Sequence, residues 1–210
     1  NCRLRTATGG CGDGGATMMQ IDRTHYACRP WKNGLGESLE VAAEHDPDFT
    51  GSGAADGWDS LVWSLSFTSF SAPTRFSDMN GFDRLLTLMS GRALALRALD
   101  GARDLVVPLG GVIEFGGGRL LEGLPDGTAK VMNLIGRRRR VRMGLEWLGE
   151  ESPRRLLVAD VVLVSALLGE SRFAGISISD EATLRLDKAR INTRVEGSTV
   201  LVATIDRTGG

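Results

Sequence analysis

The stretch Leu61-Val62-Trp63-Ser64-Leu65-Ser66-Phe67-Thr68 decides the fold class of this chain. Bulky apolar residues alternate in it with Ser and Thr, so the apolar side chains share one face of an extended strand and the hydroxyls share the other. The same period of two returns over residues 141–147, where Val, Met, Leu and Trp alternate with Arg, Gly and Glu. Both segments are therefore predicted to be β-strands.

Short apolar segments separated by glycine and aspartate follow on both sides of residues 141–147. Strands are predicted over residues 85–89, 94–96, 106–108, 112–115, 130–135, 176–179, 182–186, 190–195 and 199–205. Residues 155–168 are predicted to form two strands or one bent strand. Long amphipathic helices are missing from this pattern, which is typical of an antiparallel barrel or sandwich.

The domain organisation follows from the distribution of these strands. Residues 1–20 have no periodicity and are predicted to form a flexible leader, and residues 44–60 are predicted to form a polar loop. Strands are dense on both sides of about residue 150. We therefore expect a first barrel over residues 21–148 and a second half over residues 149–210.

Charge and composition argue against several classes of partner. The formal net charge is −1, so no global field favours nucleic acid or an anionic membrane. The one basic block, residues 137–140, has no aromatic neighbours for base stacking and is interpreted as a solvated strand end. The longest apolar run, residues 156–168, contains Asp160 and is too short to span a bilayer. We expect neither nucleic acid nor a membrane as partner.

The cysteines and histidines predict a reduced, metal-free protein. Cys2, Cys11 and Cys28 are odd in number and form no C-x-x-C motif, so free thiols in a cytoplasmic setting are expected. His25 and His45 do not form an H-x-H pair, whereas a catalytic metal normally needs about three protein ligands. No metal and no cofactor are predicted.

Three segments resemble one known family. They are Pro30-Trp31-Lys32-Asn33-Gly34 with its continuation to Ala42; Val62–Ser66 with Phe76-Ser77-Asp78-Met79-Asn80-Gly81-Phe82-Asp83-Arg84; and Asp126-Gly127 with Met132-Asn133-Leu134 and Arg137-Arg138. Together they look like the HutD/Ves family, strongly over residues 22–148 and by pattern beyond.

This resemblance implies a fold and a biological setting. The fold is an all-β, cupin-like (RmlC-like jelly roll) double barrel, a bicupin, in a bacterial cytoplasmic protein. Family members are linked to histidine utilisation, with a proposed regulatory role in sensing an intermediate such as formylglutamate, and the Ves branch is named for stress induction. No established enzymatic activity comes with the resemblance.

The chain also departs from the family pattern. The family usually has Gly where Leu35 stands, Arg where Ser64 stands, Arg-Phe-Pro over residues 78–80, and often Asp where Val131 stands. Two expected arginines are therefore missing. If either one grips a carboxylate in relatives, this chain binds a different ligand or binds it more weakly.

The polar residues of these motifs form the candidate ligand site. It consists of Trp31, Lys32, Asn33, Ser66, Asp83, Arg84 and Asn133, with no catalytic residue. Each has an alternative role: residues 31–34 as a structural turn, Ser66 on a solvated face, Asp83 and Arg84 as an ion pair, and Asn133 as a brace for the main chain. No histidine lies at a spacing that would make Ser66 a nucleophile.

Three functions are compatible with this sequence. The first is a non-catalytic, regulatory protein that binds a small anionic metabolite, formylglutamate-like in chemistry. The second is a metal-free isomerase or hydrolase that uses Lys32 with Asp83 or Glu40 as acid and base. The third is a module that contacts an acidic protein through residues 137–140. A homodimer is compatible with all three.

Overall fold

The computed structural model describes residues 17–53 and 57–209, and in them β-strands dominate. The chain folds as two units. Residues 26–142 with 208–209 form what we call the central unit, and the described residues up to 25 with 143–207 form the terminal unit. The helical structure in the described residues is a single 3-10 turn, η1 (Arg23–His25).

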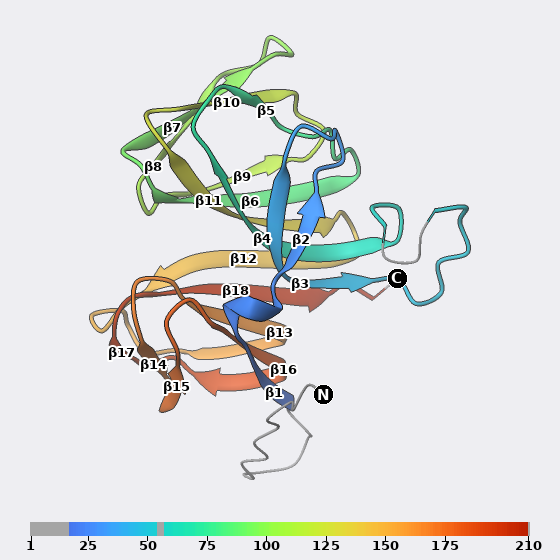
Figure 1. The fold of residues 1–210 in the computed structure, drawn as a ribbon. Helices are drawn as coiled ribbons and strands as arrows, with labels where there is room; N and C mark the ends of the chain where they lie inside the picture. Colours follow the sequence, from blue (N-terminus) through green and yellow to red (C-terminus); the bar gives the residue numbers. More distant parts are fainter. Residues whose placement is uncertain (1–16, 54–56, 210) are drawn as a thin grey trace. The chain divides into compact units, whose positions relative to one another are not determined.

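The central unit is built from two antiparallel sheets (Figure 1). The six-stranded sheet has the order β2 (Ala27–Pro30), β3 (Glu37–His45), β4 (Leu61–Phe70), β11 (Ala129–Arg137), β6 (Phe82–Ser90) and β9 (Val112–Gly116). The four-stranded sheet has the order β5 (Thr74–Arg75), β10 (Leu121–Pro125), β7 (Ala93–Ala98) and β8 (Leu105–Pro108). An apolar cluster fills part of this unit: Leu86, Leu88, Leu94, Leu96, Val107, Phe115, Leu121, Ala129 and Val131.

Strand β4 has two buried faces. Trp63 and Leu65 are buried as the alternation predicted, but Ser64 and Ser66 are only 3% and 8% exposed. The interpretation of the hydroxyl face as solvated is therefore wrong. Periodicity identifies the residues that share a face, whereas the covering of that face depends on segments far away in the sequence.

The terminal unit also contains two sheets (Figure 1). One has the order β1 (Thr17–Ile21), β16 (Thr183–Asn192), β13 (Leu156–Ala166), β18 (Val200–Arg207) and β12 (Val141–Leu148). The other has the order β15 (Ile176–Ile178), β14 (Ser171–Phe173) and β17 (Val195–Gly197). Its core is apolar and includes Phe173, Val162, Val164 and Val202.

The terminal unit resolves three expectations about strand boundaries. Residues 156–166 form one continuous strand, β13. The strands predicted over 182–186 and 190–195 are mostly one strand, β16, because β16 pairs with β13 in one register across the polar break, where Lys188 has a positive φ of 51°. Residues 17–20 of the predicted leader pair with β16 as part of β1, since Met18 and Ile21 are partly buried there. The rest of that leader, with Cys2 and Cys11, lies outside the described residues.

The basic block at residues 137–140 is engaged with protein rather than solvated throughout. Arg138 pairs with Asp83 at 2.8 Å and Arg140 pairs with Asp46 at 3.0 Å. Arg137 donates to the main-chain carbonyl of Leu61, and its guanidinium lies over the ring of Phe82. These partners leave less of the block available for an acidic protein than the sequence indicated.

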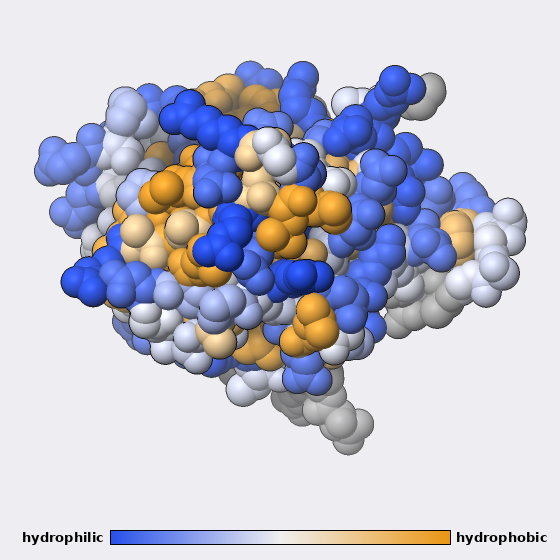
Figure 2. All heavy atoms as spheres, turned by 90° about the horizontal axis from the view of Figure 1, so that it is seen from above, coloured by the Kyte–Doolittle hydropathy of each residue, from blue (hydrophilic) through white to orange (hydrophobic). Residues whose placement is uncertain are grey.

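The outer side of the four-stranded sheet carries apolar residues. Val106 on β8 is 63% exposed and pairs in register with Ala95 on β7, which also pairs with Leu124 on β10. Figure 2 shows hydrophobic residues gathered between hydrophilic ones on this side of the central unit. Among the described residues, no helix has the length and apolar character needed to cross a membrane.

The turn after β9 yields a test of the central unit. A Cβ added at Gly117 would lie 2.5 Å from the main-chain oxygen of Met79, whereas one added at Gly116 would lie 3.3 Å from a flexible Arg138 side chain. We expect Gly117→Ala to lower the free energy of unfolding by about 1–3 kcal/mol and Gly116→Ala to lower it by well under about 1 kcal/mol. Urea denaturation of both variants measures this, and equal losses would contradict it.

Candidate functional site

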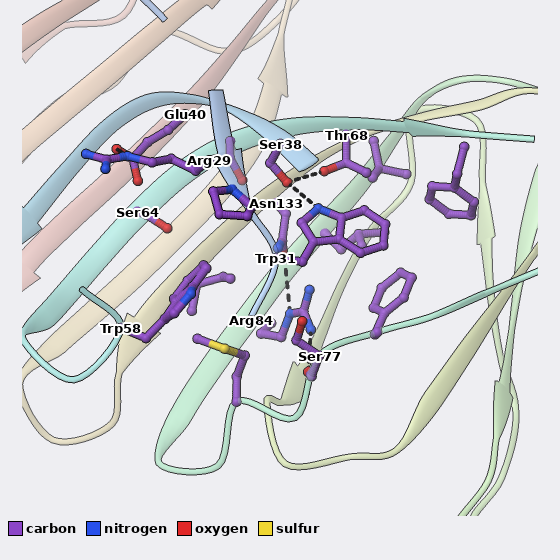
Figure 3. Close-up of a pocket in the computed structure, with 18 residues that line it drawn as sticks. Arg29, Trp31, Ser38, Glu40, Trp58, Ser64, Thr68, Ser77, Arg84 and Asn133 are labelled. Carbon is purple, nitrogen blue, oxygen red and sulfur yellow. Dashed lines mark hydrogen bonds and ion pairs between the residues drawn. The ribbon is translucent and has the colours of Figure 1, made fainter. Parts of the chain in front are cut away.

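A pocket opens in the central unit over the inner face of the six-stranded sheet (Figure 3). Its volume is about 60 Å³, several times the space that one water molecule requires. Its lining residues are Arg29, Pro30, Trp31, Ser38, Glu40, Trp58, Ser64, Ser66, Thr68, Phe70, Phe76, Ser77, Met79, Arg84, Leu86, Val131, Asn133 and Ile135. The size and the mixed lining suit a small solute.

The strand register brings the polar lining residues together. Glu40 on β3 pairs with Ser66 on β4, and Ser66 pairs with Asn133 on β11. Arg84 on β6 pairs with Ile135, two residues after Asn133. Since residues two apart on a strand share a face, all four polar side chains lie on the pocket side of the sheet.

Arg84 is the central feature of the site. It is only 7% exposed, and its guanidinium carbon lies 5.0 Å from the centre of the Phe76 ring and 5.4 Å from that of Phe115. Its Nε donates to Asn133 Oδ1 at 3.4 Å, and one Nη donates to the main-chain oxygen of Ser77 at 3.5 Å. No carboxylate of the described residues forms an ion pair with it.

Burial lowers the pKa of Arg84 to about 10. The side chain therefore still carries a positive charge at neutral pH. Because the folded-state pKa lies below the ordinary value, burial of this charge destabilises the folded protein at any pH below about 10. The penalty is on the order of 3 kcal/mol, and it shrinks as pH rises from about 10 toward the ordinary pKa.

Asp83 does not accompany Arg84 into the pocket. It is the preceding residue on β6, so its side chain leaves from the opposite face of the sheet, where it pairs with Arg138. The predicted alternative of an Asp83–Arg84 ion pair is therefore wrong, and Asp83 is not a lining residue.

The loop between β2 and β3 separates the three residues predicted there. Trp31 lines the pocket, and its Nε1 donates to Ser38 Oγ at 2.7 Å. Lys32 is exposed and is not a lining residue. Asn33 is exposed as well, and its Nδ2 donates to the main-chain oxygen of Arg75 at 3.0 Å. Gly34 closes the turn with a φ of +70°, so Asn33 and Gly34 have the structural role that was the alternative for this box.

The pocket hydroxyls differ in how they are satisfied. Ser38 Oγ lies 2.6 Å from Thr68 Oγ1. The Trp31 indole N–H only donates, so it uses neither hydroxyl proton of Ser38 and Thr68. One of these two protons forms the hydrogen bond between the hydroxyls, and the other can be donated to a further acceptor. The side-chain hydroxyls of Ser64 and Ser66 form no hydrogen bond with any side chain or main chain of the described segments. These hydroxyls are open to a ligand.

Several lining residues were not predicted as ligand-site residues. The sequence analysis predicts Glu40 only as an acid–base residue of an enzyme, and it predicts no role for Arg29 or Trp58. Arg29 Nε donates to Glu40 Oε1 at 3.2 Å (Figure 3). Trp58 stands on a connection that Arg137 holds through the carbonyl oxygen of Asp59 at 2.7 Å. Only the period of two on β3, which places Ser38 and Glu40 on one face, was a usable signal.

Metal ligands are not gathered in the described segments, where no group of His, Cys, Asp and Glu has a suitable arrangement. His45 Nδ1 lies 2.9 Å from Ser60 Oγ, and His25 belongs to the η1 turn. The absence of a metal from the functional protein stays a prediction.

The unpaired guanidinium makes a prediction about stability. Replacing Arg84 by Met keeps most of the side-chain volume and removes the buried charge, so we expect the ligand-free protein to become more stable by about 1–3 kcal/mol. Arg138→Met, which removes a partly exposed and paired guanidinium from the neighbouring strand, serves as control and is expected to cost about 0–1 kcal/mol. Urea unfolding of ligand-free protein measures both; a destabilised Arg84→Met variant would refute the argument.

The comparisons with known proteins agree with this architecture. A curated protein from Pseudomonas putida, described as an uncharacterized 21.2 kDa protein in the hutC 3' region, is 25% identical over 151 residues, which are 71% of this chain and 75% of that protein. HutD from Pseudomonas fluorescens SBW25, solved under a formate condition, has a TM-score of 0.75 at 22% identity, covering 91% of this chain and 100% of that one. A conserved protein of unknown function from Pseudomonas aeruginosa PAO1 has a TM-score of 0.72 at 24% identity, covering 90% and 98%.

The fold likeness extends to a bacterial pirin from Escherichia coli, with a TM-score of 0.57 at 11% identity over 91% of this chain and 100% of that one. The predicted all-β, cupin-like fold is thus confirmed. The model of the family described as HutD matches residues 23–203. Since this match spans most of the chain, the protein belongs to the HutD family, as its motifs predicted.

Proposed function

We propose that this protein binds a small anionic metabolite in the pocket of the central unit and acts as a non-catalytic, regulatory binding protein. The observation that carries the proposal is Arg84, a buried guanidinium without a carboxylate partner among the described residues. A buried charge of this kind is destabilising unless a counter-charge arrives, and a carboxylate matches its planar set of donors.

Binding is favoured over catalysis by the composition of the pocket. Glu40 is the one carboxylate among the described lining residues, and it is already paired with Arg29. An enzyme that uses Lys32 with Asp83 is disfavoured, because neither residue lines the pocket. General acid–base chemistry needs positioned groups within hydrogen-bond reach of the reacting atoms.

The relatives suggest the biological setting. The P. putida relative is described by its place in the hutC 3' region, and the solved P. fluorescens protein is called HutD. We infer that the present protein is associated with histidine or amino-acid catabolism in the cytoplasm and that its ligand resembles formylglutamate. The missing arginines at Ser64 and Asp78 are a reason to test other acids alongside it.

A thermal-shift screen tests this function. Formylglutamate, urocanate and related small acids are added to the protein at constant ionic strength, and an acid present at about 100 times its Kd stabilises the fold by about 2.7 kcal/mol. We expect Arg84→Met to lose this stabilisation and Arg138→Met to keep it. If no acid raises the melting temperature, or if Arg84→Met responds like the unmodified protein, the proposal fails.

A further inference from the structure

We propose that the pocket binds one carboxylate of its ligand at Arg84 and, at its opposite end, prefers a hydrogen-bond donor such as an amide or ammonium N–H to a carboxylate. The inference rests on the proposed function, because it takes Arg84 as the site of the carboxylate. It assigns to Glu40 the recognition of the other end of the ligand.

The first step is the order of the polar residues across the sheet. Glu40, Ser66, Asn133 and Arg84 stand on four successive strands, β3, β4, β11 and β6. Strand spacings of about 4.8 Å place the two outer backbones about 14 Å apart. The long side chains of Glu40 and Arg84 shorten this span, so a ligand of a few carbons has the right length to reach both. Figure 3 shows the Arg29–Glu40 pair and Arg84 on different sides of Asn133.

The second step is the direction of the hydrogen bonds at the Arg84 end. Asn133 Oδ1 accepts a hydrogen bond from Arg84 Nε, so the amide nitrogen Nδ2 of Asn133 points away from Arg84 and can donate to a ligand. The remaining guanidinium N–H groups are donors too. This end of the pocket therefore presents donors that suit the oxygens of a carboxylate.

The third step is the acceptor capacity at the Glu40 end. Glu40 Oε1 accepts one bond from Arg29, and Oε2 has no hydrogen-bond partner among the described residues. The Glu40 side chain is 17% exposed, whereas that of Arg29 is 40% exposed, so solvent screens the arginine more than the carboxylate. A second carboxylate at this end would meet a like charge, while an N–H group would gain an acceptor.

Isothermal titration calorimetry with a matched pair of probes tests the inference. Glutarate carries two carboxylates, and glutaramate has the same length and shape with one carboxylate replaced by an amide. We expect the protein to bind glutaramate at least about tenfold more tightly than glutarate. Glu40→Gln is expected to bring the two affinities within about threefold of each other, mainly by improving glutarate binding.

Two control variants define what would overturn the inference. Glu122→Gln removes a carboxylate that is also 3.2 Å from an arginine, Arg97, but lies outside the pocket, so it is expected to keep the preference. Glu40→Asp keeps the charge and is expected to keep the preference too, which covers the case in which Glu40→Gln does not fold. Glutarate binding as tightly as glutaramate, or no binding of either probe, overturns the inference. If other acids still depend on Arg84 in the thermal screen, the proposed function survives that result. If both probes bind Arg84→Met as tightly as they bind the unmodified protein, the proposed function itself fails.

Discussion

The buried Arg84 guanidinium is the constraint on which the site depends. It lies over the rings of Phe76 and Phe115, and its only hydrogen-bond acceptors in the described residues are an amide oxygen and a main-chain carbonyl. Neither acceptor neutralises the charge, so the folded protein bears a desolvation cost that a carboxylate at this position would have removed. Groups that weaken a fold in this way are concentrated at functional sites.

The six-stranded sheet provides enough apolar packing to offset the destabilisation caused by these buried polar groups. One face of β4 buries Trp63 and Leu65, and the other presents Ser64 and Ser66 to the pocket. Apolar packing elsewhere in the unit, for instance around Leu86, stabilises the strands that carry the polar residues. The polar groups thus occupy fixed register positions instead of mobile loops, which favours a preorganised binding site.

The sequence predicted the positions of the strands better than it predicted which of their faces are buried and which side chains meet there. Alternation over 61–68 identified β4 and the residues sharing its faces, yet it misplaced the hydroxyl face in solvent, since the cover of that face comes from distant segments. The motif comparison selected Arg84 and Asn133, which the structure brings into contact. It did not separate Asp83 from Arg84, although a period of two places neighbours on opposite faces. The Arg29–Glu40 pair was out of reach, because it depends on the pairing of β2 with β3.

Hydroxyl groups in the two units have different surroundings, and this difference bears on the proposed ligand site. In the terminal unit, the buried Ser165 and Thr183 hydroxyls are hydrogen-bonded to each other at 2.8 Å. In the central unit, Ser64 and Ser66 lack protein partners in the described chain and border open space beside a cation. A hydroxyl that is hydrogen-bonded within the protein contributes to stability, whereas an open donor next to an unneutralised charge gains its partner when a solute binds. This contrast supports the proposal that the ligand site lies in the central unit.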